Sequence, residues 1–347
     1  MKNPSRILIV RLDRIGDVVL STPVIANLRA AFPDAHIAFM CRPVARDIVD
    51  GNLDLDEVII YDKNGAQKNF FKTFLFACGL ARKNFDWAVN LHPSNRSNWI
   101  LFIAGIPVRA GWDRKNGRLL THRIRDVKHE GLKHELEYNL DVLRALEVPI
   151  VSEKLYFPVK DHEMNQFRLI FEAMKINVPD KMIVIHASAS CPSKRWPQEY
   201  FIELVGKISK WGKVVIVGEK NENCFSDKIA AESKIIDLRG KLTLAQLGCL
   251  FKKSLLFISN DSGPVHIAAA VGTPVISIFG RNDPGLSPAR WRPLGENSRY
   301  LHKTPGCKPC LAHNCDKDFR CLRLTTPDDV YTIAKSILEP NGGQTRC

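Results

Sequence analysis

An acidic residue, a hydroxyl and a glycine stand together where one apolar run of this chain ends. Residues 255–280 read LLFISNDSGPVHIAAAVGTPVISIFG, which predicts a strand, a loop, a helix and a second strand. Asp261, Ser262 and Gly263 then lie at the helix start, where free amides and the dipole favour an anion, and His266 follows. Helix capping with a core-packed histidine is the simpler interpretation, but these four residues exceed what capping needs. The stretch therefore predicts a sugar diphosphate site, with Asp261 turned toward sugar hydroxyls because a carboxylate repels phosphate.

A second loop gathers hydroxyls and cations after the apolar run at 182–188. Its sequence, ASASCPSKRWPQEYF, places Ser188 and Ser190 ahead of Lys194. Backbone amides, hydroxyls and a flexible cation together are able to hold a diphosphate without a metal ion. A solvated basic loop with Trp196 as a packing anchor accounts for the same residues equally well.

The loop after the first apolar run carries one candidate catalytic carboxylate. Residues 11–29 read RLDRIGDVVLSTPVIANLR and contain only Gly16 where a dinucleotide fingerprint needs three glycines, so we expect no nicotinamide cofactor. Asp17 opens a predicted helix, either as an N-cap or as a carboxylate that takes a proton from an attacking hydroxyl. After a later strand, Glu219 or Glu222 gives a weaker signal for an acid that binds a ribose.

Alternating apolar and amphipathic segments predict the elements that position these loops. Short buried strands are expected at 6–12, 36–42, 57–62, 86–92, 182–188, 213–219, 234–240, 255–261 and 275–280. Between two of them, residues 197–212 place Phe201, Leu204, Val205 and Ile208 on one helical face, with Gly212 as the stop. The pattern predicts an α/β protein with parallel sheets covered by helices on both faces. The polar, proline-containing stretch 152–163 divides it into two doubly wound domains, 1–157 and 158–347, which we expect to face each other across a cleft.

Composition narrows the class of protein. The chain has 347 residues, 45% hydrophobic and 25% charged, as expected for a soluble globular protein of two domains. The absence of a signal peptide or of an apolar run of about 18–20 residues predicts a cytoplasmic enzyme. The formal net charge of +13 calls for an anionic partner. Because the basic residues are scattered and accompany no nucleic-acid-binding signature, we expect no nucleic acid.

Four of the ten cysteines cluster near the C-terminus. Cys307, Cys310, Cys315 and Cys321 form a C-x2-C-x4-C-x5-C pattern with His313 inside it. Four thiolates this close together are able to hold a structural zinc ion. Reduced thiols, or a redox-labile pair, are the alternative and fit a chain without an export signal.

Three of these regions resemble the signature regions of glycosyltransferase family 9, the heptosyltransferases of lipopolysaccharide inner-core assembly. They are RIGDVVLSTPVIANLRAAFP, HASASCPSKRWPQEYF and SNDSGPVHIAAAVGTPVISIFG, in the family's order and spacing. The resemblance implies a GT-B fold of two Rossmann-like domains, the first binding the acceptor and the second the nucleotide sugar. It implies inversion at the anomeric carbon with no required metal or cofactor. It also implies transfer of a heptose from ADP-L-glycero-D-manno-heptose to an anionic lipid-linked core oligosaccharide, by an enzyme peripheral to the cytoplasmic face of the inner membrane.

The resemblance also implies roles for individual residues. Asp17 matches the catalytic base, and Lys194 matches the lysine that neutralises the donor phosphates. Glu222 falls where an acid binds the ribose, with Glu219 as the alternative alignment, and Leu242 falls where an apolar residue lines the nucleotide pocket. The expected donor-binding residues are Ser188, Ser190, Lys194, Glu222, Leu242, Asp261, Ser262, Gly263 and His266.

Two other functions remain open from the sequence. A transferase of the same family acting on a different nucleotide sugar would share every motif. A non-catalytic module that binds a sugar nucleotide or saccharide would keep the donor loop but would not need Asp17. Loss of transfer with intact donor binding on replacement of Asp17 separates the enzyme from the binding module.

Overall fold

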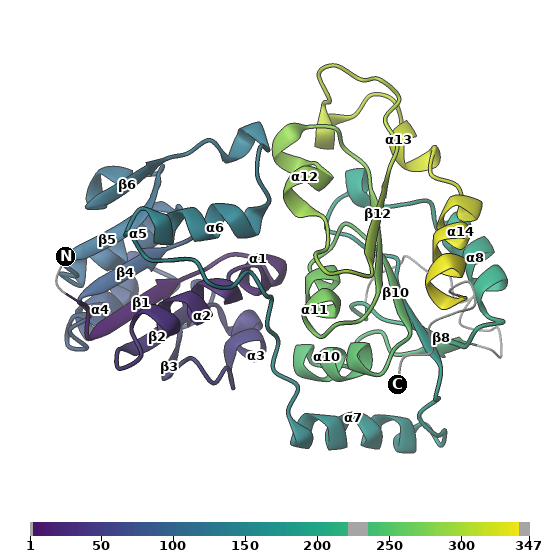
Figure 1. The fold of residues 1–347 in the computed structure, drawn as a ribbon, viewed down its shortest axis with the longest axis horizontal. Helices are drawn as coiled ribbons and strands as arrows, with labels where there is room; N and C mark the ends of the chain where they lie inside the picture. Colours follow the sequence, from purple (N-terminus) through teal and green to yellow (C-terminus); the bar gives the residue numbers. More distant parts are fainter. Residues whose placement is uncertain (1–2, 221–234, 340–347) are drawn as a thin grey trace. The chain divides into compact units, whose positions relative to one another are not determined.

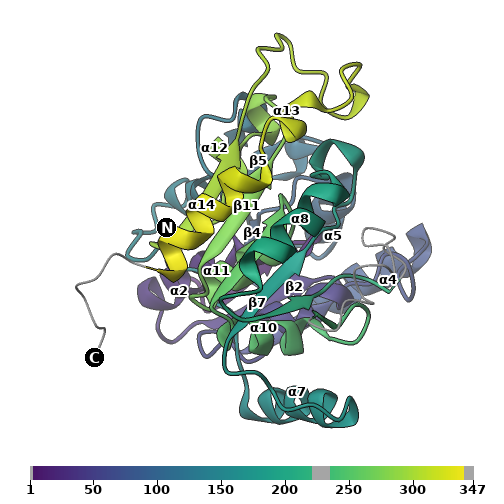
Figure 2. The same cartoon turned by 90° about the vertical axis from the view of Figure 1, so that its right-hand side faces the viewer.

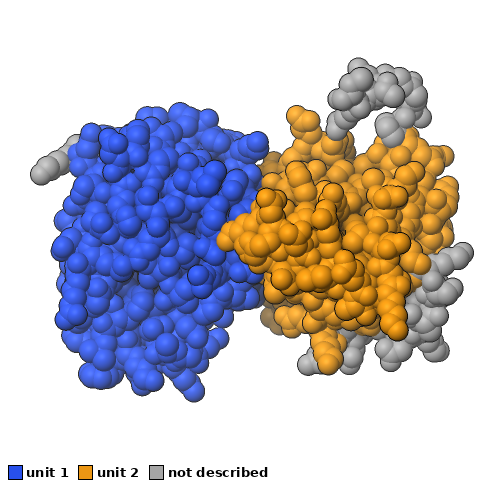
Figure 3. Space-filling view, turned by 90° about the horizontal axis from the view of Figure 1, so that it is seen from below, with its two compact units in different colours: residues 1–158 blue, residues 159–347 orange. Residues whose placement is uncertain are grey.

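The structure is a computed structural model that describes residues 3–220 and 235–339. The chain divides into two compact units, residues 1–158 and 159–347 (Figure 3). Each unit contains one six-stranded sheet in which all paired neighbours are parallel. Within the described ranges, no helix combines the length and the apolarity needed to cross a bilayer.

The sheet of the first unit has its first strand near the centre. The strand order is β3-β2-β1-β4-β5-β6, so the chain moves outward from β1 in one direction and then returns to build the other side. The strands are β1 (Arg6–Val10), β2 (His36–Cys41), β3 (Glu57–Ile60), β4 (Trp87–Asn90), β5 (Val108–Asp113) and β6 (His122–Arg125). The order reverses between β1 and β4, and loops beyond the carboxyl ends of strands at such a point commonly bind ligands.

Helices cover both faces of this sheet (Figure 1). They are α1 (Ile15–Val19), α2 (Thr22–Ala31), α3 (Arg46–Val49), α4 (Phe70–Ala81), α5 (Asn95–Ile103) and α6 (Glu135–Arg144). Because side chains alternate along a strand, Leu8 and Val10 of β1 pack with Ala77 and Leu80 of α4, whereas Ile7 and Ile9 point to the opposite face. Helices α2 and α6 contact each other, α2 also contacts β2, and α6 contacts β4.

The second unit repeats the arrangement. Its strand order is β12-β11-β10-β7-β8-β9, with the reversal between β7 and β10. The strands are β7 (Met182–His186), β8 (Lys213–Ile216), β9 (Ile235–Asp237), β10 (Leu256–Asn260), β11 (Val275–Phe279) and β12 (Ser298–His302). The helices are α7 (Asp161–Ala173), α8 (Gln198–Ile208), α10 (Leu244–Lys252), α11 (Pro264–Ala270), α12 (Pro288–Trp291), α13 (Arg320–Arg323) and α14 (Pro327–Leu338). Helices α8 and α14 lie together on one face of the sheet (Figure 2).

The predicted helical face of α8 is confirmed. Phe201, Leu204, Val205 and Ile208 are all buried in the core of the second unit, where they pack with Val330 and Ala334 of α14. Burying each large apolar side chain contributes roughly 1.5–3 kcal/mol to the stability of the fold. The helix ends at Ile208, earlier than the predicted stop at Gly212.

Candidate functional site

A buried arginine organises the loop after β1. Arg11 is 2% exposed and lies beyond the carboxyl end of β1, where the strand order reverses. Its Nε donates to Asp13 over 2.8 Å, and its Nη2 donates to Asp17 over 2.6 Å and to Glu135 of α6 over 3.1 Å. Its Nη1 donates to Asn139 over 2.9 Å. The guanidinium therefore fixes two neighbouring carboxylates, Asp13 and Asp17, in defined positions.

The structure places Asp17 inside helix α1, so the N-cap interpretation is wrong. Arg14 is the N-cap residue and makes no side-chain capping bond, whereas Asp17 is the third residue of the helix. The Asp17 side chain keeps 13% of its surface accessible. It is thus held in place by Arg11 while part of its carboxylate stays accessible.

The carboxylates of Asp13 and Asp17, which both bind Arg11, have opposite pKa shifts. Burial, followed by the negative charge of Asp13, raises the pKa of Asp17 to about 7, against the opposing attraction of Arg11. Burial also acts to raise the pKa of Asp13, but Arg11 and His92 together lower it below its ordinary value. The Nδ1 atom of His92 lies 3.1 Å from the Asp13 carboxylate. A pair whose pKa values are pushed apart in this way supplies one permanent anion, Asp13, and one group able to take up a proton near neutral pH, Asp17.

Glu135 is held by a second buried cation. The Nζ atom of Lys128 donates to Glu135 over 2.9 Å and lies 4.7 Å from the centre of the Trp112 ring. The Glu135 carboxylate therefore accepts from Arg11 and from Lys128, so its buried charge is compensated. Sequence reasoning missed Arg11, Asp13, Lys128 and Glu135. The sequence did offer a reason to select Arg11 and Asp13 as candidate site residues, because both are charged and directly follow an apolar strand.

In the second unit, His186 brings together two of the predicted serines. It is the last residue of β7, and its Nε2 lies 3.0 Å from the Ser188 hydroxyl. Its Nδ1 lies 3.3 Å from the Ser262 hydroxyl and 3.2 Å from that of Ser259, which is itself 2.9 Å from Ser262. The predicted His266 is buried within α11. The loops after β7 and β10 thus meet where the strand order reverses, through a histidine that the sequence analysis did not single out.

Asp261 pairs with two cations. The Nζ atom of Lys194 lies 3.0 Å from the Asp261 carboxylate, and Arg281 donates to the same oxygen. The N-cap residue of α11 is Gly263, so Asp261 does not cap that helix. One anion between two cations leaves a surplus positive charge, which suits a phosphate. The carboxylate faces cations in this structure, and its contact with sugar hydroxyls stays a prediction.

Backbone geometry holds Arg281 beside the Lys194 loop. Arg281 has φ +52°, in the left-handed region that costs a non-glycine residue about 1 kcal/mol or more, and such strain concentrates at functional sites. The preceding Gly280 packs so closely on the backbone of Ser193 that an added Cβ would lie 2.7 Å from the Ser193 carbonyl oxygen. A side chain at Gly280 would therefore push the Lys194 loop away from Arg281.

The burial of the remaining predicted residues differs from one to the next. Ser190 and Glu219 are exposed, and Leu242 is partly exposed. Glu222 lies outside the described residues. Trp196 is the packing anchor that the simpler interpretation expected, because it is buried and its Nε1 donates to the Thr325 carbonyl over 2.8 Å.

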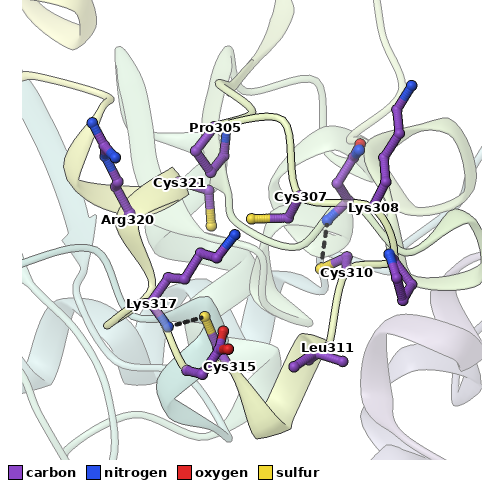
Figure 4. Close-up of a pocket in the computed structure, with 12 residues that line it drawn as sticks. Pro305, Cys307, Lys308, Cys310, Leu311, Cys315, Lys317, Arg320 and Cys321 are labelled. Atoms are coloured by element: carbon purple, nitrogen blue, oxygen red, sulfur yellow. Dashed lines mark hydrogen bonds between the residues drawn. The ribbon is translucent and has the colours of Figure 1, made fainter.

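The cysteine cluster lines a pocket of about 180 Å³ (Figure 4). The sulfur of Cys310 accepts from the backbone N–H of Asn282 over 3.2 Å, and the sulfur of Cys315 accepts from the backbone N–H of Lys317 over 3.4 Å. His313 is 2.9 Å from the hydroxyl of Ser193, next to Lys194. Across residues 3–220 and 235–339, no three His, Cys, Asp or Glu side chains are grouped to hold a metal ion, so the zinc interpretation is not supported.

Comparisons with known proteins cover nearly the whole chain. The sequence profile of "Glycosyltransferase family 9 (heptosyltransferase)" matches residues 74–319. Lipopolysaccharide heptosyltransferase 3 of Escherichia coli K12 is 28% identical over 341 residues, which is 93% of this chain and 95% of that protein. A solved glycosyl transferase family 9 structure from Veillonella parvula superposes with a TM-score of 0.86 at 21% identity, covering 97% of this chain and 98% of its own. The Escherichia coli ADP-heptose lipopolysaccharide heptosyltransferase II superposes with a TM-score of 0.77 at 23% identity, covering 96% and 98%.

Proposed function

This chain belongs to glycosyltransferase family 9 and is a glycosyltransferase, and from that premise we propose that it adds a heptose to a lipid-linked core oligosaccharide of lipopolysaccharide. The expected GT-B fold is confirmed by the two parallel sheets and by the solved heptosyltransferases that match both units. We propose ADP-L-glycero-D-manno-heptose as the donor. The names of the relatives support heptosyl transfer, and one solved structure is named for ADP-heptose.

The observation that carries the proposed reaction is the Asp17 carboxylate on Arg11. Its raised pKa, about 7, suits a general base at neutral pH, since such a base must be deprotonated yet still basic. In the proposed step, Asp17 takes the proton of an acceptor hydroxyl as the hydroxyl oxygen attacks the anomeric carbon. The new carbon–oxygen bond forms while the bond to the ADP phosphate breaks, so ADP leaves with the electron pair and the anomeric configuration inverts.

The second unit holds the donor in this proposal. Lys194 and Arg281 share one carboxylate, Asp261, so a diphosphate arriving beside them meets a net positive charge. We propose that Lys194 exchanges its contact with Asp261 for the donor phosphates, with the hydroxyls of Ser188, Ser190 and Ser262 as further donors. Fixed cations and hydroxyls placed where charge develops stabilise a leaving diphosphate, and this is the basis for proposing transfer without a required metal.

The test is a transfer assay with the purified chain. Incubation with ADP-heptose and core lipids truncated at successive heptoses should increase the mass of one acceptor by one heptosyl residue, and NMR should show inversion at its anomeric carbon. Asp17→Asn should abolish transfer while leaving donor affinity, measured calorimetrically, within about twofold of the parent. Transfer only from UDP- or GDP-sugars would refute the proposed donor. Full turnover by Asp17→Asn would refute the base.

A further inference from the structure

Helix α4 presents an unusually apolar surface to solvent. Phe70, Phe71, Phe74 and Leu75, here called the α4 face, are each between 41% and 74% exposed. Residues four apart align along a helix, so Phe70 with Phe74 and Phe71 with Leu75 form two adjoining rows. The rows lie on the side away from Thr73 and Leu80, which are buried. Single exposed apolar residues are ordinary, whereas a contiguous set of exposed apolar side chains marks a surface that binds a ligand, a protein or a membrane.

The segment that carries the α4 face is strongly basic. Residues 63–112 contain a single acid, Asp86, whose carboxylate is occupied by the backbone N–H groups of Ser5 and Arg6. The basic residues of this segment are Lys63, Lys68, Lys72, Arg82, Lys83, Arg96 and Arg109. Lys68, Lys72 and Arg82, near the two ends of α4, are exposed. The apolar rows are therefore bordered by positive charge.

The neighbouring helix adds exposed aromatic rings. Helix α5 contacts α4 and carries Trp99 and Phe102, which are both exposed and whose ring centres lie 6.1 Å apart. The Arg109 guanidinium lies 5.7 Å from the centre of the Phe102 ring. Aromatic rings and long basic side chains both suit a boundary with apolar groups on one side and water on the other.

We propose that the α4 face docks the first unit on an anionic lipid bilayer. An amphipathic helix with Phe and Leu on one face and Lys or Arg at its borders binds at the interface, through its apolar side chains and the attraction of anionic headgroups. Protein interfaces are depleted in lysine, which makes a second protein the poorer fit to this face. The inference deepens the proposed function, because a lipid-linked acceptor presents its hydroxyl at a bilayer surface.

Vesicle flotation with the full-length chain tests the proposal. The chain should bind vesicles of phosphatidylcholine with phosphatidylglycerol, bind pure phosphatidylcholine vesicles weakly, and be released as salt is raised. Phe70→Ser with Phe71→Ser should weaken binding about tenfold or more, and so should Lys68→Gln with Lys72→Gln. The matched control is Leu53→Ser with Leu132→Ser, which removes two exposed apolar side chains elsewhere in the same unit and should bind like the parent.

The results of these experiments either support or overturn docking of the α4 face on an anionic bilayer. Equal binding by the parent and the Phe70/Phe71 variant, or no binding to anionic vesicles, overturns the proposal. A parent dimer that the same variant dissociates would make a second copy of the chain the occupant. Transfer to a delipidated, soluble acceptor should be unchanged in all three variants. If that transfer is absent in the parent while vesicles are still bound, the proposed function fails and the docking surface stands.

Discussion

Replacing Asp13 by asparagine should shift the pH dependence of transfer through its neighbour Asp17. The two carboxylates bind different nitrogens of Arg11, over 2.8 and 2.6 Å. The pKa of Asp13 is lowered, so this residue is ionised at neutral pH, and its charge is the second cause, after burial, of the raised pKa of Asp17. Asp13→Asn removes that charge and keeps a similar shape, so the pKa of Asp17 should fall.

The magnitude follows from the shared guanidinium. Carboxylates on adjacent nitrogens of one guanidinium lie roughly 5–6 Å apart, and at an effective dielectric constant of about 20 their repulsion is about 3 kcal/mol. A pKa unit corresponds to about 1.4 kcal/mol, so the upper limit is a fall of about two units. Allowing for relaxation around the smaller charge, the expected fall is about one to two units.

The assay is kcat/KM for heptosyl transfer between about pH 5 and 9. In the parent, kcat/KM should fall about tenfold per pH unit below about 7, where Asp17 becomes protonated. In Asp13→Asn the same fall should begin about one to two units lower. Asp34→Asn, which removes an exposed acid, controls for net charge and should leave the profile in place. If kcat/KM of a folded Asp13→Asn protein falls at the same pH as in the parent, the assignment of that fall to protonation of Asp17 is refuted.

Four further outcomes follow from the two loops. The raised pKa of Asp17 means that the folded state favours the protonated side chain. The contribution of Asp17 to the stability of the fold is therefore fully present below about pH 4 and is lost as the pH rises to about 7. In urea unfolding, the free energy of unfolding of Asp17→Asn should therefore rise relative to that of the parent by up to about 4 kcal/mol between about pH 4 and 7. A difference between the two proteins that stays constant with pH would contradict this. Arg11→Met should lower the free energy of unfolding by about 3–5 kcal/mol, since the buried Glu135 and the partly exposed Asp13 and Asp17 each lose a cationic partner, and an unchanged melting temperature would count against the ion cluster. Lys194→Ala should weaken calorimetric binding of ADP-heptose about tenfold or more, whereas unchanged affinity would remove its role. EDTA should leave kcat unaltered if Lys194 and Arg281 stabilise the negative charge of the leaving diphosphate. Loss of turnover in EDTA that added Mg²⁺ restores would disprove this.

The central strands of both sheets were predictable because burial on two faces produces uninterrupted apolar runs. All nine predicted strands are present. Within residues 3–220 and 235–339, the prediction missed strands β5, β6 and β12, and each carries polar residues: VRAGWD, HRIR and SRYLH. Strands β6 and β12 end their sheets and are half exposed, so they need no apolar run.

The candidate site was predictable only as separate pieces. Asp17, Lys194 and Asp261 stand out because each is a charged residue within a few positions of the end of an apolar strand. Their partners do not, because Arg11 meets Glu135 across 124 residues of sequence and Asp261 meets Arg281 across the β10–β11 crossover. The order of strands creates those pairs. The raised pKa of Asp17 depends on burial, which no local pattern of residues reveals.

The ion cluster on Arg11 also bears on how the first unit assembles during translation. Strand β1 is made first but gains its neighbour β4 only after residue 90 has been synthesised, and Arg11 gains Glu135 later still. Before Glu135 has been synthesised, burying the Arg11 guanidinium would be costly because this carboxylate partner is absent. Nascent chains released before α6 should therefore stay sensitive to protease, and resistance should arise abruptly once the ribosome has delivered that helix.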